Sequence, residues 1–410
     1  MTTPAGSAPA ADIESSYAWL RLATAVLLAT IGGVGMWSVV VALPAIQADF
    51  GVDRAQAALP YTLAMLGFGV GGVLLGRLAD RTGIVPPLII GIAAVGLGYL
   101  GVGRSADLTQ VALAHGLIGL GCSVSFGPLM ADISHWFERR RGIAVTIAAA
   151  GNYLAGTVWP PVVQRFIAAD GWRATHTGIG LFCLATMLPL VLVMRRRMPA
   201  LSHASADAAA ALRRAEMPLS PNALQVLLCI AGVGCCVAMA TPQVHLVAYC
   251  GDLGYGPARG AEMLSLMLGL GIVSRVGSGF IADRIGGVRT LLLGSVLQGT
   301  ALVLYLFFDG LFSLYVISGL FGLFQGGIVP SYAIIVREYF PPKEAGTRVG
   351  LVLLATLVGM ALGGWLAGAI FDAAGSYRAA FLDGLGWNLL NVSIVSFLLL
   401  RGRRARAQSA

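Results

Sequence analysis

The sequence has 410 residues, of which 57% are hydrophobic and only 11% are charged. Soluble globular proteins carry about 25% charged residues, so this composition excludes the soluble class and favours a chain embedded in a membrane. The net charge of +8 does not indicate nucleic-acid binding, because the basic residues stand in short runs at the ends of apolar segments, as membrane orientation signals do.

The first predicted element is a tail at residues 1–19, rich in Ala, Pro, Ser and Thr, which we expect to be disordered. A spanning helix needs about 20 apolar residues, and this length predicts twelve such helices. Their approximate ranges are 20–45, 58–78, 86–103, 108–132, 142–167, 175–195, 223–250, 260–282, 288–308, 312–336, 347–371 and 379–400. We expect two six-helix bundles at 20–195 and 223–402, a polar cytoplasmic connector at 196–222 and a basic tail at 403–410.

The distribution of basic residues predicts the orientation in the membrane. If the N-terminus is cytoplasmic, twenty basic residues fall in inside segments and six, among them Arg54, fall outside. This bias predicts that both termini are cytoplasmic. Lys343 is the only lysine, and the strong preference for arginine indicates a bacterial, GC-rich genome, so we expect the cytoplasmic (inner) membrane.

Two patterns occur twice in the chain, at the same offset of 203 residues. The turn after the second predicted helix reads Gly-x-x-x-Asp-Arg-x-Gly, and the turn after the eighth repeats it. The copies consist of Gly76, Asp80, Arg81 and Gly83, and of Gly279, Asp283, Arg284 and Gly286. A Gly-x-x-Gly-Leu pattern ends at Gly119-Leu and recurs at Gly322-Leu. Repetition in so apolar a chain predicts two similar helical bundles, the layout of many secondary transporters.

The repeated turn is the signature loop of the major facilitator superfamily, which the whole chain resembles. The resemblance implies an all-α membrane protein with twelve transmembrane helices in two pseudo-symmetric six-helix bundles. It also implies that the loops act as a cytoplasmic latch between the two halves. Two turns with solvated charges are the simpler alternative, and the first copy lacks the usual basic residue after Gly83.

A narrower resemblance is to the monocarboxylate transporter family. The segment Trp136–Ala144 follows that family's pattern aromatic-Phe-x-basic-Arg-Arg-x-aliphatic-Ala at the start of the fifth helix, and Gly171-Trp172-Arg173 is similar to its Gly-Trp-Arg before the sixth. Thr146 departs from the pattern, because the family prefers glycine there.

Arg275 is the only basic residue well inside a predicted span. A charge at a helix centre costs on the order of 3 kcal/mol on insertion scales, so such residues usually face a pathway or a partner. The alternative is that its long side chain reaches the inner interface. The position matches the eighth-helix arginine that binds the substrate carboxylate in the monocarboxylate transporter family. A guanidinium fork fits a carboxylate with two hydrogen bonds.

The sequence lacks the proton-carrying residue that the family resemblance leads us to expect. Proton-coupled members of the family carry an aspartate one helical turn before this arginine, and here that position is Gly271. Histidine titrates near neutral pH, so His115 and His245 are the proton-coupling candidates, although a lone histidine in an apolar helix is more often structural. Three weaker candidates lie close enough to an interface to be solvated charges: Asp132, Glu262 and Asp383.

Other polar and aromatic side chains at mid-span are candidates for a substrate site with Arg275. These residues are Trp37, Tyr61, Asn152, Tyr153, Gln243, His245, Gln325 and Tyr332. Packing of the aromatic rings and interhelical hydrogen bonding of the amides are the alternatives.

The sequence has no Walker-type phosphate loop, no nucleophile elbow and no cysteine or histidine cluster with metal-ligand spacing. We therefore expect no enzymatic activity, no cofactor and no metal. The hypothesis is a monomeric secondary transporter that carries small organic anions, monocarboxylates first, by alternating access, with proton symport left open. The alternatives are an anion exchanger, a carrier for a neutral or cationic solute with Arg275 structural, and a non-transporting membrane sensor.

Overall fold

The computed structural model describes residues 13–196 and 219–409, and this part of the chain is helical without a β-strand. Most of the predicted tail and connector lies outside the described residues. The elements are α1 (Ser16–Gly32), α2 (Val34–Phe50), α3 (Arg54–Ala57), α4 (Leu59–Thr82), α5 (Val85–Gly103), α6 (Leu108–Cys122), η2 (Ser123–Ser125), α7 (Gly127–Ser134), α8 (Arg141–Val191), η3 (Leu192–Arg195), α10 (Pro221–Asp252), α11 (Pro257–Ile285), α12 (Gly287–Phe307), α13 (Leu311–Gln325), α14 (Ile328–Tyr339), α15 (Pro342–Ala374) and α16 (Tyr377–Ser409).

The described residues contain eleven helical segments that are long and apolar enough to span a membrane. One of them, Arg141–Arg195, has 55 residues and is broken at Gly171, where the backbone takes a φ of 80°. A left-handed φ of this kind is a conformation that glycine adopts easily. Because the chain turns back at Gly171, this segment crosses twice, and the predicted number of twelve crossings is confirmed.

Several predicted helix boundaries were wrong by four residues or more, among them the first and the last. Helix α1 begins at Ser16 and not near residue 20, because the Ser15 hydroxyl accepts a hydrogen bond from the Ala18 backbone N–H at 3.3 Å and so caps the helix. Helix α16 continues to Ser409, through the predicted tail at 403–410.

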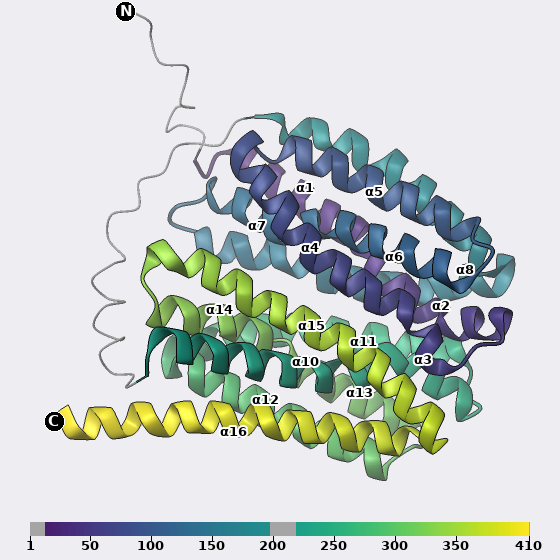
Figure 1. Ribbon diagram of the computed structural model, residues 1–410. Helices are drawn as coiled ribbons and strands as arrows, with labels where there is room; N and C mark the ends of the chain where they lie inside the picture. The colour runs from purple at the N-terminus through teal and green to yellow at the C-terminus, as the bar shows by residue number, and fades with distance from the viewer. Residues whose placement is uncertain (1–12, 197–218, 410) are drawn as a thin grey trace, which may run out of the picture.

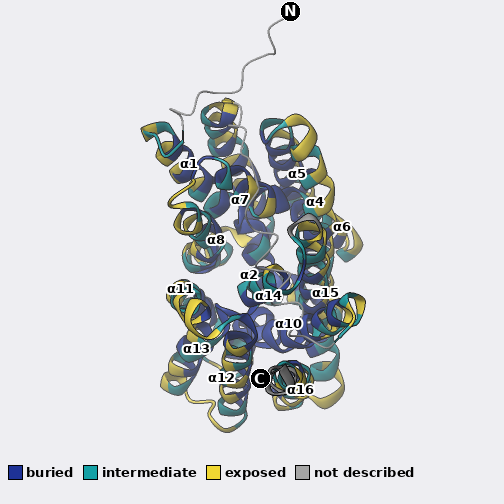
Figure 2. Cartoon of the chain, turned by 90° about the vertical axis from the view of Figure 1, so that its left-hand side faces the viewer, coloured by how far each residue is buried: buried dark blue, intermediate teal, exposed yellow. Residues whose placement is uncertain are grey.

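The helices pack as two groups, a first half (α1–α8) and a second half (α10–α16), which Figure 2 shows one above the other. Each half has its own cluster of buried side chains. The cluster of the second half also includes residues of α2, α4 and α8 where the two halves meet. We call the end where α1 begins and α16 ends the terminal end. The opposite end, with α3 and the turn from α15 to α16, is the distal end (Figure 1).

The second repeated pattern packs the helices in both halves in the same way. A Cβ added to Gly119 would lie 1.9 Å from the Ala64 carbonyl oxygen, and one added to Gly322 would lie 2.0 Å from that of Met267. Ala64 and Met267 are again 203 residues apart, so the repeat holds for both members of each contact. The glycines allow two backbones to meet where no side chain would fit.

Many large apolar side chains on the outer surface are exposed, with Phe312 83% and Phe307 70% accessible. Apolar surface of this extent would be unstable in water and suits contact with lipid. The chain is therefore a multi-pass membrane protein.

Candidate functional site

Arg275 lies on α11, where this helix faces α8 of the first half. Its Nη1 donates to the Ala149 carbonyl oxygen at 3.3 Å, and its Nε lies 3.5 Å from the Gly326 carbonyl oxygen. Its guanidinium also lies over the Tyr153 ring, 4.4 Å from the ring centroid. The side chain therefore points into the space between the two halves and not toward the membrane surface.

The polar contacts of Arg275 leave it able to bind a ligand. Both carbonyl contacts are longer than the roughly 2.7–3.2 Å of a good N–H···O hydrogen bond, and Nη2 makes no hydrogen bond with any described residue. A carboxylate could therefore take two N–H donors from this guanidinium at once.

Gly271 stands where the family resemblance leads us to expect an aspartate. An aromatic ring fills the space beside this glycine. A Cβ added to Gly271 would lie 2.4 Å from Cε1 of Tyr153, so the ring packs directly on the glycine. The same ring lies below the Arg275 guanidinium. Tyr153 thus occupies the space beside Arg275 that an aspartate side chain at 271 would need.

A cavity of about 770 Å³ lies between the halves, and Arg275 is part of its wall. Five other predicted residues also line it: Trp37, Tyr61, Asn152, Tyr153 and Gln243. The remaining wall is largely apolar and includes Met36, Phe68, Met239, Leu268, Leu354 and Leu357. The cavity extends toward the terminal end, where Arg77 and Asp80 lie at its mouth. It is a mostly apolar chamber with one arginine in its interior.

Two polar groups of the cavity wall have a defined orientation. Gln243 Nε2 donates to Gln325 Oε1 at 2.9 Å, and both residues are buried. Gln325 is not part of the cavity wall, so its effect on a ligand would pass through Gln243. The Trp37 indole N–H is buried and has no hydrogen-bond partner among the described residues.

Three other predicted site residues lie away from the cavity. Tyr332 is buried in the second half, where its hydroxyl accepts a 2.6 Å hydrogen bond from Asn391 Nδ2. His115 is buried in the first half and its Nδ1 donates to the Val111 carbonyl oxygen at 2.8 Å. His245 belongs to the distal end, described below.

The two signature loops form the same turn in both halves. Gly83 and Gly286 follow the helices with φ values of 81° and 82°, a region that favours glycine. Asp80 and Asp283 are exposed, and neither makes a hydrogen bond or an ion pair with the opposite half among the described residues. The pattern therefore corresponds to a specific turn, and its role as a latch stays a prediction.

The distal end is closed by contacts of Arg54, for which the sequence predicts no more than an outside charge. Arg54 extends from α3 of the first half, and its Nη1 and Nη2 each donate to a carboxylate oxygen of Asp252 at 3.1 Å. Nη1 also donates to the Tyr377 hydroxyl at 2.5 Å, and the guanidinium lies over the Phe371 ring. All three partners belong to the second half.

The backbone at the start of α3 is bound by the second half as well. The Asp372 carboxylate accepts hydrogen bonds from the backbone N–H groups of Arg54 at 2.9 Å and Ala55 at 2.8 Å. A carboxylate is favourable at a helix start, where N–H groups lack partners in the helix. A Cβ added to Gly368 would lie 2.9 Å from the Ala55 backbone, so α15 and α3 are in close contact.

His245 joins this network from α10 and is almost fully buried. Its Nδ1 lies 3.0 Å from the Tyr377 hydroxyl, and its Nε2 lies 2.7 Å from the Gly364 carbonyl oxygen. His245 therefore belongs to the contacts that close the distal end.

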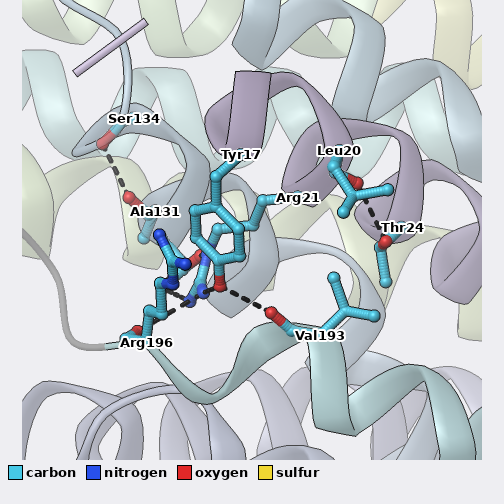
Figure 3. Close-up of polar contacts among 9 residues, drawn as sticks. Tyr17, Leu20, Arg21, Thr24, Ala131, Ser134, Val193 and Arg196 are labelled. Atoms are coloured by element: carbon cyan, nitrogen blue, oxygen red, sulfur yellow. Dashed lines mark hydrogen bonds and ion pairs between the residues drawn. The ribbon is translucent and has the colours of Figure 1, made fainter. Parts of the chain in front are cut away.

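The terminal end contains a buried ion pair that the sequence does not predict either. Nε and Nη2 of Arg21 donate to the Asp132 carboxylate at 2.7 and 2.8 Å, and both side chains are at most 2% accessible. The interpretation of Asp132 as a solvated charge was wrong, because α1 covers it. Figure 3 shows Arg21 beside Tyr17, whose hydroxyl accepts from Arg21 at 2.9 Å and donates to the Val193 carbonyl oxygen.

Comparison with known proteins agrees with this architecture. The family model of the Major Facilitator Superfamily matches residues 25–311 and 267–410. Monocarboxylate transporter 13 of Bos taurus is 28% identical over 335 residues, which cover 80% of this chain and 75% of the relative. An MFS-type transporter of Aspergillus niger is 26% identical over 337 residues, covering 80% of this chain and 75% of the relative.

Among solved structures, a bacterial homolog of the human lysosomal transporter Spinster has a similar fold. Its inward-facing and occupied conformation matches with a TM-score of 0.70 at 14% sequence identity, covering 96% of this chain and 97% of that chain. Its inward-facing and unoccupied conformation matches with a TM-score of 0.69 at 15% identity, covering 95% and 96%. At this level of identity the match concerns the fold alone.

Proposed function

The chain belongs to the major facilitator superfamily, and on that basis we propose that it carries small organic anions, monocarboxylates first, by alternating access. The observation that carries this proposal is the Arg275 guanidinium in the wall of the central cavity, with Nη2 left without a hydrogen bond to any described residue. The relatives named monocarboxylate transporter 13 support the same substrate class.

The charge of the cavity favours a monoanion over a dianion. Arg275 is the charged residue of the interior wall, and Arg77 and Asp80 at the mouth carry opposite charges. One fixed positive charge neutralises one carboxylate, whereas the second carboxylate of a dianion would remain unpaired in an apolar chamber. Asn152 and Gln243 supply polar groups for the rest of the substrate, and Trp37 an aromatic wall.

The orientation follows the charge distribution. Basic residues are concentrated in the segments that form the terminal end, so we assign this end to the cytoplasm and the distal end to the outside. In this assignment the cavity faces the cytoplasm, both termini are cytoplasmic, and the protein lies in the cytoplasmic (inner) membrane as a monomer.

The test is uptake of radiolabelled lactate and pyruvate into proteoliposomes that contain the purified protein. We expect Arg275→Ala to lower the apparent affinity about 10- to 100-fold, since a hydrogen bond to a charged group contributes roughly 1.5–3 kcal/mol. Arg275→Lys should keep part of the uptake, because lysine retains the charge but not the fork. Arg289→Ala, which removes an exposed arginine of α12, is the matched control.

Unchanged uptake by Arg275→Ala would contradict the proposal. If that variant instead lowered thermal stability without changing uptake, Arg275 would be a structural link between the halves, and a neutral or cationic solute would become the better candidate. Binding without flux would favour a sensor. Uptake driven by an imposed pH gradient would establish proton symport, whereas uptake driven only by internal substrate would establish exchange.

A further inference from the structure

The hydrogen bonds around His245 have only one consistent direction. The Gly364 carbonyl oxygen can only accept, so Nε2 of His245 must carry a hydrogen and donate to it. The Arg54 guanidinium can only donate, so the Tyr377 hydroxyl oxygen accepts from Arg54. The Tyr377 hydroxyl hydrogen is then free to bond Nδ1 of His245, 3.0 Å away, if that nitrogen has a lone pair. The chain of bonds runs from Arg54 through Tyr377 and His245 to Gly364.

This chain joins the two halves and requires a neutral imidazole. Arg54 belongs to the first half, whereas Tyr377, His245 and Gly364 belong to the second. We infer that Arg54, Tyr377 and His245 form an outer gate that closes only while His245 is neutral, so that a proton taken up by His245 from the outside opens the distal end. This inference depends on the alternating-access fold and the assigned orientation, and not on the substrate.

Protonation of Nδ1 would disrupt the closed gate in two ways. Nδ1 would become a donor, so the Tyr377 oxygen would face donors from both Arg54 and His245, and its own hydrogen would lose the acceptor that it has now. A second positive charge would also be enclosed with only the Tyr377 hydroxyl between it and Arg54, in a site where His245 is only 1% accessible.

In the closed state, the carboxylates near the gate are occupied elsewhere. They do not replace Nδ1 of His245 as the acceptor for the Tyr377 hydroxyl hydrogen. Asp252, on α10 like His245, is bound to the Arg54 guanidinium, and Asp372 on α15 is bound to the backbone of Arg54 and Ala55. Neither makes a hydrogen bond with the imidazole. Tyr249 of α10 packs edge-on against Tyr377 and carries no charge. The charged group nearest to His245 along the hydrogen-bond chain is therefore the Arg54 cation.

Opening of the distal end separates Arg54 from Tyr377 and admits water to His245. Water can accept a hydrogen bond from either imidazole nitrogen, so the open gate accepts the protonated ring that the closed gate excludes. For one linked proton, the ratio of open to closed gate changes by at most about tenfold per pH unit. An acidic exterior should thus favour the outward-open conformation.

The experiment measures the opening of the distal end directly. Nitroxide labels are attached at Ala106→Cys, in the exposed turn between α5 and α6, and at Ala374→Cys, at the exposed end of α15, and their separation is measured by pulsed electron spin resonance. Between about pH 8 and pH 5, the range in which histidine titrates, we expect a longer-distance population to appear in the labelled protein as the pH falls.

Two variants identify the residue responsible. His245→Gln keeps a donor for Gly364 and an acceptor for Tyr377 but cannot take up the proton, so its distances should be independent of pH and should stay short. Tyr377→Phe removes the link itself and should give the longer population at every pH. His176→Gln is the control, because His176 is equally buried but bonds only the Trp172 carbonyl oxygen inside the first half.

The inference is overturned if the distances of the parent protein do not change with pH, or if His245→Gln keeps the full pH response. It is also overturned if His176→Gln abolishes that response as completely as His245→Gln does. None of these outcomes bears on carboxylate uptake by Arg275, so the two proposals can fail separately.

Discussion

The two ends of the molecule use buried charge differently. At the distal end, the pair Arg54–Asp252 joins the two halves, and the Asp252 side chain is 37% accessible. At the terminal end, the pair Arg21–Asp132 stays within the first half and is at most 2% accessible. Among the described residues, no ion pair at the terminal end crosses between the halves.

The difference fits the alternating access that we propose, in which each end opens in turn while each half moves as a unit. The distal pair has to break whenever that end opens, and a partly solvated carboxylate can exchange its partner for water at moderate cost. The terminal pair lies between helices of one half and never has to break. Full burial makes separation of the two charges very unfavourable. It is therefore compatible only with a pair that stays together, as the terminal pair does.

The largest effect that we expect is on folding of the first half. Asp132→Ala leaves the Arg21 guanidinium buried without its partner and should lower the free energy of unfolding by about 3–5 kcal/mol. Thermal unfolding of the purified protein in detergent measures this loss. Glu344→Ala, which removes the exposed partner of Arg348, should change it by less than about 0.5 kcal/mol.

The corresponding positions of the second half indicate a double variant that should restore this stability. The positions 203 residues after Arg21 and Asp132 are Leu224 and Ile335, and both are buried. The double variant Arg21→Leu, Asp132→Ile should therefore recover most of the stability, because an apolar pair can replace a buried ion pair. If the double variant is no more stable than Asp132→Ala, the halves are not equivalent at these positions.

A smaller effect should follow from crowding at the distal end. Gly368→Leu places a side chain against the backbone of Ala55 and should destabilise the closed distal end by about 1–3 kcal/mol. The nitroxide pair described above should then report the open population at neutral pH. Gly251→Ala, at the same end with no atom within 4 Å of the added Cβ, should leave the distances unchanged. If the two variants gave the same nitroxide distances, this would contradict the close contact between Gly368 and the Ala55 backbone.

The smallest effect concerns Asp372. Asp372→Asn weakens two hydrogen bonds to the start of α3 and should shift the balance between closed and open distal end by about 1–2 kcal/mol, since the carboxylate is exposed. Thermal stability should stay close to that of the parent, because each half keeps its own core. A large loss of thermal stability would mean that the contact between the halves also holds the individual halves together.

Most of the fold could be predicted from the sequence, because the information is local. Runs of apolar residues set the helices, and positive-φ glycines such as Gly83 and Gly286 set the turns between them. The boundaries at Ser16 and Ser409 were missed because helix ends depend on single caps and on polar residues that can also remain unfolded.

The candidate site was only partly predictable. Arg275 was found because a charge inside a span is unusual in itself, whatever its surroundings. Tyr332 and His115 were misplaced because polar residues at mid-span serve packing within a half as readily as a cavity. Which face of a helix meets the cavity depends on how the helices are rotated against one another, and the apolar residues on all sides of these helices give no signal for that rotation.

The sequence by itself determined that this chain crosses a membrane twelve times, that its halves repeat, and that one arginine lies inside a span, because each of these depends on composition and spacing along a single helix. Only the tertiary structure decided which end is closed and which charges meet there. Arg54 binds partners 198 and 323 residues away, and their proximity depends on how two preformed bundles dock, for which no stretch of the sequence carries a local pattern.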